Sequence, residues 1–78
     1  MSIAQERVDE LNLLLQFNMN SLQEGIKVHT SAETSVINAA QRLFDKGLLT
    51  QVDGGYLTDL GMEAAEMADK LLRIIADT

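Results

Sequence analysis

The polar side chains between Thr30 and Gly47 are the groups in this chain best suited to recognising a ligand. The segment reads TSAETSVINAAQRLFDKG, and its apolar residues recur at helical spacing, so the sequence predicts a helix over 30–46. The apolar side is expected to be buried; it consists of Val36, Ile37, Ala39, Ala40, Leu43 and Phe44. The side expected to face outward consists of Thr34, Ser35, Asn38, Gln41, Arg42 and Asp45.

Apart from Asp45, the outward residues have short hydroxyl groups, amide groups or a guanidinium, the types that read base edges in the major groove of DNA. The alternative interpretation is the solvated side of an ordinary amphipathic helix. Both ends of the helix have local signals. Thr30 and Glu33 have capping-box spacing, Lys46 suits the negative helix end, and Gly47 can close the helix in a left-handed conformation.

Composition restricts the class of protein. A chain of 78 residues is one small domain, and its 46% apolar content is too high for a disordered protein. The chain has no cysteine, no basic-then-apolar leader and no long apolar run, so we expect a single domain over 1–78 in the cytoplasm, without a membrane span. The net charge of −6 disfavours nucleic acid as a partner. Residues 20–52, however, carry three basic and three acidic side chains, so the acidic excess lies in the flanking segments.

The first part of the chain predicts two helices. Ser2 and Gln5 have capping-box spacing, and a helix is expected to run to about Phe17. Its expected buried stripe consists of Ala4, Val8, Leu11 and Leu15, with Leu14 beside it. Ser21 and Glu24 repeat the capping spacing, which predicts a short helix over 21–28 with Gly25 at a close helix crossing.

After Gly47 the pattern changes to a hairpin and a last helix. Residues 48–52 and 56–58 are predicted strands about Asp53-Gly54-Gly55. Thr58 is the expected cap of a helix over about 59–76. Two adjacent apolar stripes run along that helix with heptad spacing. They consist of Leu60, Ala64, Met67, Leu71 and Ile74, and of Ala65, Ala68, Leu72 and Ile75.

The order of these elements and two motifs resemble a bacterial winged helix-turn-helix regulator. Residues 21–49 are similar to the helix-turn-helix of that family, and they end in Arg42-Leu43-Phe44-Asp45-Lys46-Gly47-Leu48. Tyr56-Leu57-Thr58-Asp59-Leu60-Gly61 resembles the exit from the family's wing. The fold expected is therefore mainly α with a small β-hairpin: three helices, a two-stranded wing and a C-terminal helix.

The resemblance implies a DNA-binding transcriptional regulator that uses the 30–46 helix for recognition. By analogy Thr34, Ser35, Asn38, Gln41 and Arg42 would face bases, and Lys27 and Lys46 would face phosphates. The wing has Asp53 and two glycines where DNA-binding wings usually carry Arg or Lys. The alternative function is therefore a winged-helix module that binds proteins and not DNA.

The last helix is expected to form a homodimer, because its apolar arc is wider than one small core requires. The expected interface consists of Leu60, Ala64, Met67, Ala68, Leu71, Leu72 and Ile75. One histidine and no cysteine leave no catalytic set to assign, so we expect no enzyme, cofactor, metal or small-molecule substrate. The expected core consists of Leu11, Leu15, Leu22, Ile26, Val36, Ala40, Leu43, Leu48, Leu57, Met67 and Leu71.

Overall fold

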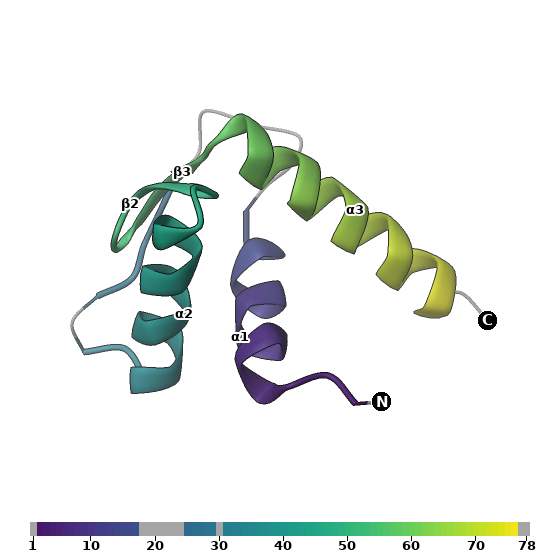
Figure 1. The fold of residues 1–78 in the computed structure, drawn as a ribbon, viewed down its shortest axis with the longest axis horizontal. Helices are drawn as coiled ribbons and strands as arrows, with labels where there is room; N and C mark the ends of the chain where they lie inside the picture. Colours follow the sequence, from purple (N-terminus) through teal and green to yellow (C-terminus); the bar gives the residue numbers. More distant parts are fainter. Residues whose placement is uncertain (1, 18–24, 30, 77–78) are drawn as a thin grey trace.

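The computed structural model describes residues 2–17, 25–29 and 31–76. Within these residues the elements are α1 (Gln5–Leu14), β1 (Ile26–Lys27), α2 (Thr34–Asp45), β2 (Leu49–Gln51), β3 (Gly54–Leu57) and α3 (Asp59–Ala76) (Figure 1). The fold class predicted from the sequence, mainly α with a small β-hairpin, is confirmed. α1 packs mainly against α2, while α3 diverges from α1 toward its C-terminal end (Figure 1).

α1 buries a different stripe from the one predicted. The buried residues are Leu13, Leu14 and Phe17. Of the predicted stripe, Val8, Leu11 and Leu15 are only half-buried, and Ala4 is exposed. The helix ends at Leu14, so the helical period does not continue to Phe17 as expected. The predicted Ser2–Gln5 capping box is also wrong, because the N-cap is Ala4 and it has no side-chain cap.

α2 begins later than predicted but ends as expected. Its N-cap is Glu33 without a side-chain cap, so Glu33 does not close the predicted box; Thr30 lies outside the described residues. At the C-terminal end, the amide of Gly47 donates to Phe44 O at 3.0 Å and the amide of Leu48 donates to Leu43 O at 2.9 Å. These bonds form a Schellman motif around Gly47, which has a φ of 83°.

The wing contains a third strand that the sequence did not predict. The sheet order is β1-β3-β2, and both neighbouring pairs are antiparallel. The predicted helix over 21–28 is therefore wrong at Ile26 and Lys27, and its residues 21–24 lie outside the described residues. Gly25 does permit a close approach, but to Gly55 of β3 and not to a helix.

The hairpin turn is shorter than predicted and begins one residue earlier. Val52 and Asp53 form the turn, and both glycines that follow belong to β3. A Cβ on Gly54 would lie 2.5 Å from the carbonyl oxygen of Ile26 in β1, so the additional strand needs a glycine there. The φ of Gly54 is 120°, which also excludes most other residues.

The cap and length of α3 match the prediction, but its buried side does not. Thr58 Oγ1 accepts from the amide of Gly61 at 3.0 Å, and the Thr58 hydroxyl donates to Gly47 O at 2.6 Å. Met67 and Leu71, expected in the core, are exposed. Instead the buried residues of α3 are small: Gly61, Ala65 and Ala68. These small residues allow α3 to pack closely on the rest of the domain.

The predicted core is confirmed only in part. Leu22 lies outside the described residues, and four other expected core residues are half-buried against the core: Ile26, Val36, Leu48 and Leu57. Phe44, expected to be buried, is exposed. The core itself consists of Leu13, Leu14, Phe17, Ala39, Ala40, Leu43, Leu49 and Ala65.

Candidate interaction surfaces

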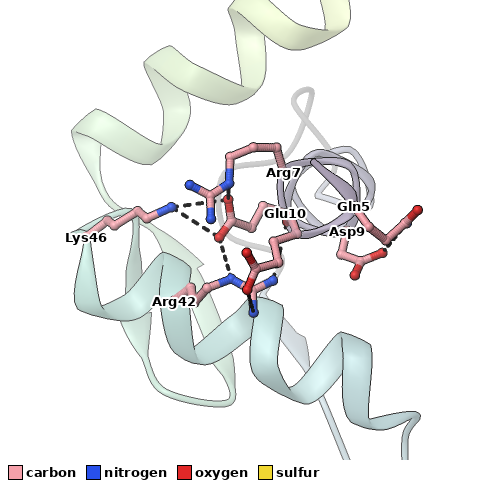
Figure 2. Close-up of polar contacts among 7 residues, drawn as sticks. Gln5, Arg7, Asp9, Glu10, Arg42 and Lys46 are labelled. Atoms are coloured by element: carbon pink, nitrogen blue, oxygen red, sulfur yellow. Dashed lines mark hydrogen bonds and ion pairs between the residues drawn. The ribbon is translucent and has the colours of Figure 1, made fainter. Parts of the chain in front are cut away.

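Glu10 forms the centre of an ion cluster between α1 and α2 (Figure 2). Arg42 Nε donates to Glu10 Oε2 at 2.7 Å, and Lys46 Nζ donates to Oε2 at 3.1 Å and to Oε1 at 3.2 Å. Arg7 Nε lies 2.9 Å from Oε1. Arg42 and Lys46 are four residues apart, so consecutive turns of α2 present both side chains to the same carboxylate.

The cluster keeps the buried carboxylate of Glu10 ionised. Burial alone would raise the pKa of Glu10, but hydrogen bonds from Arg42 and Lys46, and the positive charges of Lys46 and Arg7, outweigh burial and lower the pKa below the usual value for Glu. Arg42 Nη2 also donates to the backbone oxygen of Glu6 at 3.3 Å. The two helices are thus joined by polar contacts beside their apolar contact.

The residues predicted to contact DNA fall into two groups. Thr34, Ser35, Asn38 and Gln41 lie exposed on α2, as expected. Arg42, expected to face outward, is half-buried and turned toward α1, and Lys46 also contacts Glu10. Lys27 is exposed on β1, a different element from α2.

The exposed side of α2 therefore presents little positive charge. Gln41 Nε2 donates to Asp45 Oδ1 at 3.0 Å, so the amide and the acid lie together one turn apart. Beside them, a shallow hollow of about 250 Å³ separates α2 from the wing. Its lining is mostly apolar but includes Asp53; the lining residues are Val28, His29, Ile37, Gln41, Val52 and Asp53. An apolar hollow beside an acid is poorly suited to a phosphate backbone.

α3 exposes a row of large apolar side chains. Met67, Leu71 and Ile74 are 60%, 57% and 67% exposed, and Leu60 one turn before Ala64 is exposed as well. These residues and the half-buried Ala64 repeat at intervals of four and three, so they lie along one side of the helix. We call this side the α3 apolar row; it consists of Leu60, Ala64, Met67, Leu71 and Ile74.

The predicted dimer interface coincides with the α3 apolar row only in part. Ala68, assigned to the interface, is 8% exposed and packs within its own domain, so little of its surface is left for a second copy. Leu72 and Ile75 are exposed, but they follow Ala68 at helical spacing and so lie on the side of α3 that is buried at Ala68. Ile74 was missing from the predicted interface although its spacing places it on the row.

The charged residues of α3 are divided between its two halves. The first half carries Asp59, Glu63 and Glu66 and no cation, whereas the second half carries Asp69 and both cations, Lys70 and Arg73. Arg73 Nε lies 2.9 Å from Asp69 Oδ2 on the solvent side of the helix. Glu63 and Lys70, one heptad apart, both flank the α3 apolar row.

Two further findings concern metals and membranes. Across residues 2–17, 25–29 and 31–76, no group of three or more His, Asp or Glu side chains could hold a metal ion. Over the same residues, none of the helices combines the length and the apolar character that crossing a bilayer requires.

The described elements define a small, mainly helical domain with an antiparallel wing, an arrangement compatible with a winged helix. The chain belongs to a family of unknown function, DUF5669, whose family model matches residues 1–76. Comparison with curated proteins and with solved structures finds no match. The function must therefore be argued from the surfaces of the chain itself.

Proposed function

We propose that this domain is a protein-interaction module and that the α3 apolar row is its binding surface. The observation that carries the proposal is the exposure of Leu60, Met67, Leu71 and Ile74 along one side of a single helix. Scattered exposed apolar residues need no explanation, but a contiguous row of large ones is typical of a contact surface. A partner that presents its own apolar helix face would fit such a row.

The charges favour this function over DNA binding. Affinity for DNA depends largely on cations that neutralise phosphates. Arg42 and Lys46, the two cations of the expected recognition helix, are bound to Glu10, and Asp53 lies in the wing turn. Moving either cation to a phosphate would leave the Glu10 carboxylate with fewer partners, and burial makes that costly.

The test places a photo-crosslinking amino acid at position 67 on the α3 apolar row. We expect an adduct with another polypeptide, either the same chain or a different protein identified by mass spectrometry, and then a measured dissociation constant for the purified pair. Leu71→Glu should weaken that association at least about 100-fold, because it puts a charge into a desolvated contact.

The matched control uses Val52, an exposed apolar residue in the wing turn. A crosslinker at position 52 should give no adduct, and Val52→Glu should leave the association unchanged. The proposal is overturned if position 67 gives no adduct, or if Leu71→Glu and Val52→Glu have the same effect.

A second candidate function is DNA binding through α2, favoured by the exposed polar side chains of Thr34, Ser35 and Asn38. Hydroxyl and amide groups of this kind suit base edges. If this function holds, fluorescence anisotropy at low salt will detect binding to duplex DNA, and Asn38→Ala will reduce it by about 1–3 kcal/mol at preferred sequences. Absence of binding to any duplex at low salt excludes this candidate.

A further inference from the structure

We infer that the α3 apolar row is occupied by the α3 of a second copy of this chain, with the two helices antiparallel. The inference rests on the proposed interaction function and names its partner. A helix that is complementary to itself when reversed pairs with a second copy about a two-fold axis. Both the apolar residues and the charges of α3 have this property.

One antiparallel register pairs four of the five residues of the α3 apolar row. When Leu60 faces Leu71 of the second copy, the two-fold axis lies between positions 65 and 66. The same axis places Met67 opposite Ala64 of the second copy, so a large side chain meets a small one on each side of the axis. Met67 is exposed, and Ala64, which is half-buried against its own core, has a small side chain that leaves space for the methionine. Heptad spacing keeps these contacts along one seam.

The charges favour the same register. In this arrangement Glu63 lies within two residues, about 3 Å along the axis, of the position directly opposite Lys70 of the second copy. Both residues flank the α3 apolar row, and each pairing occurs twice by symmetry. More broadly, the acidic half of one α3 lies over the half of the other that contains Lys70 and Arg73.

A parallel pair would lose this complementarity. It would align Asp59, Glu63 and Glu66 with the same acids of the second copy and bring like charges together. The chain already has a net charge of −6, so self-association needs local charge pairing to offset the repulsion between copies. Antiparallel pairing supplies it, which is why the observations favour this orientation.

The test uses two cysteine variants of a chain that has no cysteine of its own. Leu60 and Leu71 are both more than half exposed, so Leu60→Cys and Leu71→Cys should leave the domain folded. In the antiparallel register, a mixture of the two variants forms a mixed disulfide on mild oxidation. Each variant alone does not form one, because its two cysteines are about 16 Å apart along the axis.

The wild-type chain should sediment as a dimer at micromolar concentration, and Leu71→Glu should shift it to a monomer. A double reversal, Glu63→Lys with Lys70→Glu, should restore the dimer that either single reversal weakens. Circular dichroism checks that every variant is helical. A parallel pair reverses the disulfide pattern: each variant links to itself and the mixture gives no excess of mixed product, which overturns the inference.

A monomeric wild-type chain also overturns the inference, and the crosslinker at position 67 then separates it from the proposed function. An adduct with a different protein retains the interaction function and rejects self-pairing. No adduct at all rejects both.

Discussion

The helices α2 and α3 are both amphipathic but use their two sides in opposite ways. α2 covers its apolar side with α1 and turns Arg42 and Lys46 toward Glu10. α3 packs on the domain through small residues and leaves its large apolar side chains exposed. In the helix whose sequence suggested ligand recognition, both cations are thus used in internal contacts, whereas α3, on the other side of α1, exposes large apolar side chains (Figure 1).

The difference shows how the size of buried residues decides which side of a helix remains available. Gly61 allows α3 to lie close to Leu48 and to Leu57 of the wing, and Ala65 is buried in the core with little side-chain volume. Leu71 and Met67, on another side of the helix, then have no part of the described domain to cover them. In α2 the buried residues include Leu43, and the flanking cations are neutralised within the domain.

The largest expected effect compares a leucine on each helix. Leu43→Ala should lower the free energy of unfolding by about 2–5 kcal/mol, because Leu43 is 3% exposed and its removal leaves a cavity in the core. Leu71→Ala should change it by less than about 0.5 kcal/mol in dilute solution. Urea denaturation at sub-micromolar concentration measures both. Equal losses of stability in the two variants would contradict the difference in burial between Leu43 and Leu71.

The next effect concerns the ion cluster. Glu10→Ala should destabilise the domain by about 1–3 kcal/mol, because Arg42 and Lys46 lose their shared carboxylate while Arg42 stays partly buried. Asp9→Ala, one position away on α1 and bonded to Gln5 at an exposed site, is the matched control. A Glu10 variant as stable as the control would contradict the role of the cluster.

The same cluster predicts a dependence of stability on pH. The pKa of Glu10 is lowered in the folded state, so its ionised form contributes fully above the unfolded value of about 4.3, and the contribution is lost as the pH falls through the lower folded value. The stability difference between wild type and Glu10→Gln should be constant from about pH 6 to 7 and should shrink below about pH 4.3. Urea denaturation of both proteins across this pH range tests the prediction. A stability difference that grows as the pH falls would contradict it.

The smallest effect concerns the exposed ion pair of α3. Arg73→Ala should change the stability of the monomer by no more than about 0.5 kcal/mol, because Arg73 is 80% exposed and its pair with Asp69 is screened by solvent. Arg42→Ala should cost clearly more, since its partner Glu10 is buried. Thermal unfolding of the two variants side by side separates a structural cation from a surface one.

Much of the fold could be predicted from local sequence signals. Gly47 ends α2 and Thr58 caps α3 through hydrogen bonds between residues that are close together in the sequence, so local residue types predict them. The class of fold and the span of α3 follow from such signals together with apolar periodicity. The free apolar row could also be anticipated, because the width of the apolar arc exceeds what one small core requires.

The candidate site was less predictable, and α1 shows why. The side of α1 that is buried follows helical spacing as well as the predicted apolar stripe does; it consists of Glu10, Leu13, Leu14 and Phe17. An acid is typical of a solvent-exposed side, so the sequence favours the stripe that contains only apolar residues. Only the spatial arrangement reveals that Glu10 is buried against cations from another helix.

The sequence by itself determined the C-terminal end of α2, the cap of α3, the presence of a hairpin and the excess of apolar surface on the last helix, because each depends on residues close together in the chain. The tertiary structure decided the third strand of the sheet, the buried side of α1 and the orientation of Arg42 and Lys46. Ile26 pairs with Gly55, and Glu10 meets cations 32 and 36 residues away. Such contacts are fixed by packing between distant segments, and no local pattern specifies which pairs will meet.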